Sequence, residues 1–129
     1  MEEKTKQKIL VVEDEATLQK TLQEVLTAEN YEVFSALDGQ RGFEIAKEEI
    51  PDLILLDIIL PKMDGFEVLA AIKAEEKTES IPVIILTNLG GIDDIQKALD
   101  LGATTYIVKA DFSLEDVLRK IKETLENNR

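Results

Sequence analysis

The sequence predicts an α/β protein of the doubly wound class, in which helices cover both faces of a single parallel sheet. Five short runs rich in branched apolar residues alternate with five stretches that repeat apolar residues at helical spacing. The short runs are continuously apolar, which is typical of strands buried on both faces of a sheet. Glycine, proline and aspartate gather between these segments, where turns are expected. Together the patterns indicate one domain built from five strand–helix units.

The expected strands are short and dominated by valine, isoleucine and leucine. They are residues 9–12, 33–36, 53–56, 83–86 and 106–108. The expected helices carry apolar residues three or four positions apart, which places these residues along one helix face. The apolar positions are Leu18, Leu22, Val25 and Leu26; Phe43 and Ala46; Phe66, Leu69 and Ile72; Ile92, Ile95 and Leu99; and Leu114, Val117, Leu118, Ile121 and Leu125. The fourth helix is expected to end before Gly102, because glycine readily takes the left-handed conformation that closes a helix.

The composition is that of one globular domain, since the 129 residues are 44% hydrophobic and 33% charged. We expect the domain to fill residues 1–129, with no output domain in this chain, no secretory leader and no membrane insertion. A cytoplasmic location is the corresponding expectation. The formal net charge of −12 opposes direct binding to nucleic acid, because such binding relies on clustered Lys and Arg.

The chain contains neither histidine nor cysteine. Imidazole acid–base chemistry and thiolate ligation are therefore unavailable, and the chain cannot itself carry phosphohistidine. Any metal must be a hard cation that is held by oxygen atoms.

Polar residues stand where the expected strands end. The first strand runs into Glu13 and Asp14, the third ends in Asp57, the fourth in Thr87 and the fifth in Lys109. In open parallel sheets the carboxyl ends of the strands meet at one edge, where ligands bind. Each residue alone has an ordinary interpretation: Asp14 as a helix cap, Thr87 as a cap or loop residue, and Lys109 as a surface lysine. Their joint occurrence at four strand ends favours a functional site.

The segment LILLDIILPKMDG, residues 53–65, places the carboxylate of Asp57 among seven aliphatic residues. No cation follows it before Lys62. A buried carboxylate without a partner is costly and tends to take up a proton. We therefore expect the partners of Asp57 to come from elsewhere in the chain.

Charge balance indicates what the strand-end residues could hold. Three ionised carboxylates would repel one another, but Lys109 and one divalent cation would together neutralise them. Ligands that are all oxygen favour Mg²⁺, or Mn²⁺, over zinc or copper. This composition suits an aspartyl-phosphate site in which Asp57 is the nucleophile. The Lys109 ammonium, the Thr87 hydroxyl and the Asn88 backbone N–H would then neutralise the phosphoryl oxygens.

Four segments of the chain resemble the receiver domain of bacterial two-component response regulators, the CheY-like family. They are VVEDE at 11–15, PDLILLDIILPKMDGFEVL at 51–69, IPVIILT at 81–87 and LGATTYIVK at 101–109. The resemblance extends over essentially the whole chain and is most specific in the D-x-x-L-P-x-M-D-G run at 57–65. It implies a flavodoxin-like sheet of five parallel strands in the order 2-1-3-4-5, with five helices.

The resemblance also implies roles for individual residues. Asp57 matches the phosphoacceptor, which receives a phosphoryl group from a sensor histidine kinase or a histidine phosphotransfer protein. Glu13 and Asp14 match the acidic pair that binds Mg²⁺ with the phosphoacceptor, and the backbone carbonyl of Ile59 matches a further ligand. The family consists of signalling modules rather than enzymes, and each catalyses only its own phosphorylation and dephosphorylation.

The remaining matches concern the phosphate contacts and the output. Thr87 and Lys109 match the pair that contacts the phosphate. Tyr106 matches an aromatic switch that turns inward after phosphorylation and alters the surface of helix four, strand five and helix five, where a downstream protein target would bind. Without the resemblance, a half-buried aromatic side chain on a last strand is the preferred interpretation of Tyr106.

Two positions near the site depart from the family pattern. Ala110 stands where the family has proline, so we expect a trans bond after Lys109 and a rearranged loop from which the lysine still reaches the pocket. Asn88 stands where the family prefers a small residue, and its side chain would crowd or hydrogen-bond the phosphoryl group.

Two further side chains bear on the lifetime of the phosphate. Ile59 and Leu89 lie two positions after Asp57 and Thr87. Both side chains are apolar and cannot orient an attacking water, which predicts slow autodephosphorylation.

Other interpretations compete with a phosphorylated receiver. Because of Ala110 and Asn88, a pseudo-receiver that serves as a binding scaffold without phosphate stays open. A phosphatase of the haloacid dehalogenase type would need a second aspartate where this chain has Ile59. A flavodoxin-like cofactor binder would need a phosphate loop after the first strand, where residues 13–15 are acidic. Charged side chains on helices four and five allow a phosphorylation-linked homodimer, although a solvated face is the commoner case.

Overall fold

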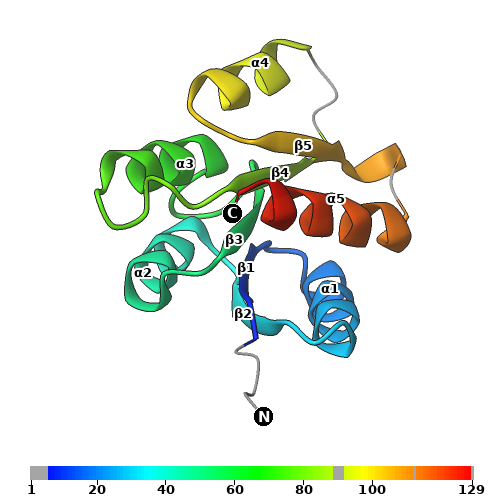
Figure 1. The fold of residues 1–129 in the computed structure, drawn as a ribbon. Helices are drawn as coiled ribbons and strands as arrows, with labels where there is room; N and C mark the ends of the chain where they lie inside the picture. Colours follow the sequence, from blue (N-terminus) through cyan, green and yellow to red (C-terminus); the bar gives the residue numbers. More distant parts are fainter. Residues whose placement is uncertain (1–5, 89–91, 112, 129) are drawn as a thin grey trace.

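The computed structural model describes residues 6–88, 92–111 and 113–128 of the chain. Within these ranges strands alternate with helices along the chain (Figure 1). The strands are β1 (Lys8–Val12), β2 (Glu32–Ala36), β3 (Leu53–Asp57), β4 (Val83–Thr87) and β5 (Thr105–Val108). The helices are α1 (Ala16–Ala28), α2 (Gly39–Glu49), α3 (Gly65–Ala74), α4 (Ile92–Asp100), the short 3-10 helix η1 (Lys109–Asp111) and α5 (Leu114–Asn127).

The strands form one parallel sheet in the order β2-β1-β3-β4-β5. Helices α1 and α5 cover one face of this sheet, and α2, α3 and α4 cover the other (Figure 1). The predicted doubly wound class and the strand order implied by the resemblance are both confirmed. Because the order reverses between β1 and β3, the carboxyl ends of these strands border the crevice in which such folds bind ligands. None of the helices in the described ranges has the length and apolarity needed to cross a bilayer.

The central strand β3 is buried along its whole length. Leu53 and Leu55 pack into the core under α1 and α5, whereas Ile54 and Leu56 pack into the core on the α2–α4 side. Alternate side chains enter different cores because successive side chains of a strand point to opposite faces. Burial on both faces therefore explains why the sequence at 53–56 is apolar without interruption.

Side chains cap the starts of α2, α3 and α5. The capping pairs are Asp38 with the Arg41 N–H at 2.8 Å, Asp64 with the Glu67 N–H at 2.9 Å, and Ser113 with the Asp116 N–H at 3.2 Å. Helix α1 differs, because Glu15 at its N-cap position makes no side-chain capping hydrogen bond. The interpretation of Asp14 as the cap of this helix is therefore wrong, and the Asp14 side chain is exposed at the end of β1.

Two expected backbone features near the C-terminal end are confirmed. Gly102 has a φ of 108° just after α4, in the region that favours glycine. The described residues contain no cis peptide bond, so the bond from Lys109 to Ala110 is trans as predicted. These two residues begin η1, which leads the chain from β5 towards α5.

Candidate functional site

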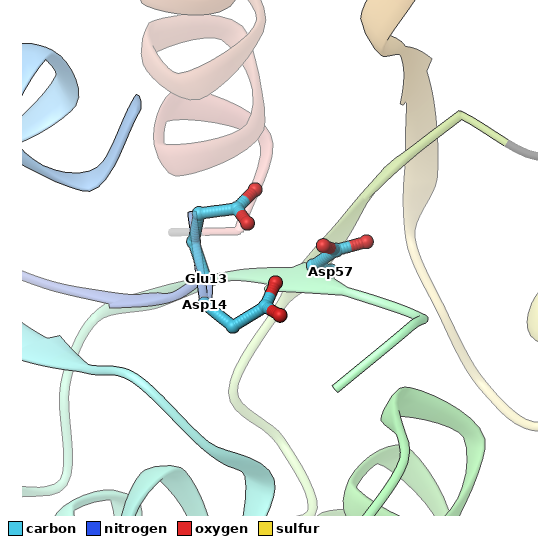
Figure 2. Close-up of side chains that lie close together, drawn as sticks. All are labelled: Glu13, Asp14 and Asp57. Atoms are coloured by element: carbon cyan, nitrogen blue, oxygen red, sulfur yellow. The ribbon is translucent and has the colours of Figure 1, made fainter. Parts of the chain in front are cut away.

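The three carboxylates predicted at the strand ends lie together at the carboxyl edge of the sheet. Glu13 and Asp14 directly follow β1, and Asp57 is the last residue of β3, the neighbouring strand. One oxygen from each side chain lies within 4.8 Å of the other two. Figure 2 shows the three side chains close together at these two strand ends. Segments more than forty residues apart in the chain thus form one acidic cluster.

Lys109 reaches this acidic cluster from beyond β4. Its Nζ lies 2.6 Å from Glu13 Oε1 and 3.0 Å from Asp57 Oδ2. The lysine directly follows β5, and β4 lies between β5 and β3, so the lysine side chain extends past the end of β4. The lysine side chain is 10% exposed, and that of Glu13 is fully buried. Asp57 therefore has a partner 52 positions further along the chain.

Burial and pairing shift the pKa values of two members of the cluster. Burial raises the pKa of the Glu13 carboxyl, against the lowering effect of the Lys109 and Glu15 hydrogen bonds, and the Asp57 charge raises it further. Burial alone would lower the pKa of Lys109, but its hydrogen bonds and charge interactions with Glu13 and Asp57 outweigh that effect and raise it. The lysine is therefore protonated at neutral pH. One ammonium among three carboxylates leaves the cluster short of positive charge.

Backbone amides fix two of the carboxylates. The Glu15 N–H donates to Glu13 Oε2 at 3.0 Å, and the Ile59 N–H donates to Asp57 Oδ1 at 3.3 Å. Each of these amides lies two residues after the side chain that it contacts. The carboxylates are therefore oriented by the loops that follow their own strands.

Gly65 allows the loop after β3 to fold back against the strand. Its N–H donates to the Ile58 carbonyl at 2.7 Å. A Cβ at this position would collide with the Asp57 carbonyl oxygen and the Ile58 Cα. The glycine that ends the D-x-x-L-P-x-M-D-G run is thus required by close backbone approach beside Asp57.

An open cavity of about 380 Å³ lies over the acidic cluster. It is lined by Asp14, Glu15, Asp57, Ile59, Asn88 and Lys109. Ile59 is 58% exposed, and the Asn88 side chain is exposed as well. Solvent and small anions can therefore reach Asp57.

Two of the predicted site residues, Thr87 and Tyr106, are not among the residues that line this cavity. Thr87 is the fully buried last residue of β4, the strand that pairs with β3. Tyr106 lies within β5, half-buried against the core on the α2–α4 side. The Lys120 ammonium lies 5.6 Å from the centroid of the tyrosine ring and donates to the Tyr106 carbonyl. Leu89, the other apolar residue predicted near the site, lies outside the described residues.

The donor set of the cluster fits a hard divalent cation. In the described part of the chain, Glu13 Oε1 is buried and has no hydrogen-bond partner apart from its ion pair with Lys109. A buried carboxylate oxygen in this state can accept a cation as a further partner. Mg²⁺ binds through one or two carboxylates, with water and phosphate oxygens as its other ligands. The cluster offers the side chains that such a site requires.

The sequence interpretation missed Gln19, which is 5% exposed on α1. Its amide contacts backbone carbonyls at the ends of β1 and β2. A signal was present, because residues 19, 22 and 26 share one helix face, and Leu22 and Leu26 belong to the core. A polar side chain in a buried helical stripe indicates a specific hydrogen-bonding role.

Comparison with known proteins identifies relatives along nearly the whole chain. The model of the response regulator receiver domain matches residues 9–122. The sporulation initiation phosphotransferase F of Bacillus subtilis is 39% identical over 119 residues, which cover 92% of this chain and 94% of that protein. A probable transcriptional regulator ycf27 of Porphyridium aerugineum is 37% identical over 129 residues, which cover 95% of this chain and 52% of that protein. The chain spans about half the length of several curated relatives that it matches.

Solved structures show the same fold and family. The CheY-like receiver domain protein of Methanospirillum hungatei has a TM-score of 0.88 at 31% identity, with 96% of this chain and 97% of that chain covered. The receiver domain of the sensor histidine kinase PA1611 of Pseudomonas aeruginosa has a TM-score of 0.86 at 29% identity, with 95% and 99% covered. That receiver domain holds a magnesium ion in its active site cleft. The chain described here belongs to the response regulator receiver domain family of two-component signalling.

Proposed function

We propose that this chain is a phosphorylation-dependent signalling module whose Asp57 accepts a phosphoryl group from a sensor histidine kinase or a histidine phosphotransfer protein. The observation that carries the proposal is the environment of Asp57. This residue is 4% exposed, lies 3.0 Å from the Lys109 ammonium, has two further carboxylates within 4.8 Å, and borders an open cavity. A carboxylate with a purely structural role can be neutralised by one cation. The additional acidic groups around Asp57 leave negative charge that a further, cationic ligand can neutralise.

In the proposed transfer, an Asp57 oxygen forms a bond to phosphorus as the bond from phosphorus to the partner's histidine nitrogen breaks. The electron pair of the broken bond stays on that nitrogen. The Lys109 ammonium, the Thr87 hydroxyl and the Asn88 backbone N–H stabilise the negative charge on the transferred oxygens. The cavity in front of Asp57 gives the phosphohistidine of the partner its route to the carboxylate.

Glu13, Asp14, Asp57 and the Ile59 backbone carbonyl are the proposed Mg²⁺ ligands. When bound, the cation neutralises charge on the phosphoryl oxygens and orients them. The magnesium ion in the receiver domain of PA1611 supports this choice of cation. Mn²⁺ prefers the same oxygen donors and is expected to replace it.

The proposed output is a change in the surface formed by α4, β5 and α5. Thr87 moves towards the phosphoryl group, and Tyr106 turns inward and alters that surface for a downstream protein target or a second copy of the chain. The half-buried position of Tyr106 on β5 supports this role. Phosphorylation can shift the conformational equilibrium only by the free energy of its new contacts, about 1.5–3 kcal/mol for each charge-assisted hydrogen bond.

The phosphorylated state is proposed to be long-lived. Ile59 lies at the cavity and is well exposed, but its side chain has no atom that can orient water for attack on the phosphoryl group. A phosphoaspartate that is hydrolysed as quickly in this chain as in an Ile59→Asn variant would contradict this part of the proposal.

Phosphoryl uptake can be tested by mixing the chain with acetyl phosphate and Mg²⁺ and measuring its intact mass. We expect the mass of one added phosphoryl group, and no addition to Asp57→Asn. Asp52→Asn is the matched control, because Asp52 precedes β3 at the opposite edge of the sheet and its substitution leaves the acidic cluster intact. This control is expected to be labelled like the parent chain.

The same experiment decides between the receiver and the pseudo-receiver. The trans bond before Ala110 and the exposed Asn88 at the cavity are the features of this chain that favour a scaffold without phosphate. A parent chain that stays unlabelled while its fold is intact, or an Asp57→Asn variant that is labelled equally, would refute the proposed phosphorylation.

A further inference from the structure

We infer that Gln19 is a positioning residue for the metal-binding acidic pair, because it holds the backbone of Glu13 at the end of β1. The inference rests on the proposed function, since it assigns a purpose to the rigidity of the proposed ligands. Gln19 does not touch the acidic side chains in the hydrogen bonds of the described residues. Its effect on a bound cation would act through the main chain.

The start of α1 lacks the side-chain cap that is found at the starts of α2, α3 and α5. Asp38, Asp64 and Ser113 cap α2, α3 and α5 with their side chains, whereas Glu15 makes no such bond at α1. The loop that carries the acidic pair leads directly into this uncapped start. Some other contact must therefore determine how the first turn of α1 lies against the ends of the strands.

The Gln19 side chain supplies that contact. From the first turns of α1 its Nε2 reaches the Ala36 carbonyl at 3.0 Å, the Val11 carbonyl at 3.1 Å and the Glu13 carbonyl at 3.3 Å. A primary amide has two N–H groups, so the three carbonyls share two hydrogens. These carbonyls belong to β1, to β2 and to the residue that follows β1. One buried side chain thus joins α1 to the ends of two adjacent strands.

The orientation of the Gln19 amide follows from its partners. Among the described residues its Oε1 is buried without a hydrogen-bond partner. Turning the amide over would place this oxygen against three carbonyl oxygens, which would be repulsive. The nitrogen therefore faces the carbonyls. The hydrogen bonds that it donates outweigh the free-energy cost of leaving the buried Oε1 without a partner.

The backbone of Glu13 is consequently held on both sides. Its N–H donates to the Ala36 carbonyl at 3.0 Å, and its carbonyl accepts from Gln19. Its side chain accepts from the Glu15 N–H, on the far side of Asp14. Asp14 thus lies in a short segment with restrained ends, although its own side chain is exposed. Residues that support metal ligands without touching the metal typically contribute about 10–100-fold to metal affinity.

The test is a Mg²⁺ titration of the parent chain and of Gln19→Met, at a temperature where both are folded. Methionine keeps the length and volume of the side chain but removes both donors. We expect the Mg²⁺ dissociation constant of Gln19→Met to rise about tenfold. In the absence of metal, the Glu15 amide should exchange its hydrogen faster than in the parent chain, because its acceptor side chain is less firmly placed.

Thr78→Val is the matched control for general loss of stability. Thr78 is fully buried and donates its hydroxyl to the Ile72 carbonyl at 2.6 Å. It lies in the connection that leads into β4, at the edge of the sheet opposite the acidic cluster. This variant should melt at a lower temperature than the parent chain and keep its Mg²⁺ affinity. A role of Gln19 in stability alone would make the two variants behave alike, with lower melting temperatures and unchanged affinities.

Unchanged Mg²⁺ affinity and unchanged Glu15 exchange in Gln19→Met would overturn the inference. If Gln19→Met does not fold, Gln19→Asn replaces it in the test. Asparagine keeps the amide, but its side chain is one methylene too short to reach the carbonyls at the strand ends. Unchanged Mg²⁺ affinity in that variant would equally overturn the inference. Failure of the proposed function would look different, because the parent chain would then bind no Mg²⁺ at the acidic cluster.

Discussion

A lysine lies among carboxylates at both edges of the sheet, but the two clusters differ in burial. At the carboxyl edge, Lys109 lies 2.6 Å from Glu13 and 3.0 Å from Asp57, and the three side chains are 10%, 0% and 6% exposed. At the amino edge, Lys8 lies 3.6 Å from Glu49, and these side chains are 34% and 38% exposed. The same residue types therefore meet in two different dielectric environments.

Exclusion of water determines which of these groups of charges can bind a ligand. Water screens the charges at the amino edge, so the Lys8 pair contributes little and attracts no ligand strongly. At the carboxyl edge water is largely excluded, and Asp14 adds a carboxylate for which Lys109 alone cannot compensate. A charge imbalance in a partly buried crevice is what a divalent cation and a phosphoryl group can relieve.

The largest expected difference between the edges is in phosphorylation. Lys109→Met should slow labelling by acetyl phosphate about 10²–10³-fold, because removal of one charge-stabilising donor has an effect of this size. Lys8→Met should label at the parent rate. Intact mass against time gives both rates, and equal rates for the two variants would remove the distinction between the edges.

The next largest effect concerns metal binding and stability. Mg²⁺ at about one hundred times its dissociation constant should raise the free energy of unfolding of the parent chain by about 2.7 kcal/mol. At the same concentration Asp14→Asn should gain less, whereas Asp52→Asn should gain as much as the parent. Urea denaturation with and without Mg²⁺ measures these gains, and a gain in Asp14→Asn as large as that in Asp52→Asn would place the cation elsewhere.

A further effect is pH-dependent and appears only without metal. Burial raises the pKa of Glu13 above its ordinary value of 4.5, so protonation of Glu13 stabilises the folded state. This stabilisation is fully present below pH 4.5 and is lost as the pH rises through the pKa of Glu13 in the folded state. Glu13→Gln mimics the protonated form. It should therefore become more stable than the parent as the pH rises from 4 towards 7, as urea denaturation in a chelator would reveal. A gap that stays constant with pH would contradict the assigned burial effect.

The smallest effect is expected at the amino edge. Lys8→Met breaks a partly solvated ion pair and should change the free energy of unfolding by about 0–1 kcal/mol, less in high salt. Chemical denaturation at two salt concentrations provides the measurement. A loss of several kcal/mol would mean that exposure does not distinguish the two clusters.

The class of fold and the four charged residues that lie together at the carboxyl edge could be predicted from local patterns. The continuous apolar run at 53–56 indicated burial on both faces, and the polar residues at the ends of four of the five runs marked Glu13, Asp14, Asp57, Thr87 and Lys109 as candidates. The strand order was available only through the family resemblance, since the spacing of apolar residues does not say which strands are neighbours. Gln19 escaped notice because a glutamine among polar helix residues is ordinary until its burial is known.

The sequence alone determined the alternation of strands and helices, because the spacing of apolar residues and the preferences of turn residues depend only on a few neighbouring positions. Tertiary structure decided that Lys109 spans the end of β4 to meet Glu13 and Asp57, and that one amide from α1 joins the ends of β1 and β2. Those contacts depend on strand order, on side-chain reach and on the exclusion of water, which arise only when distant segments pack together.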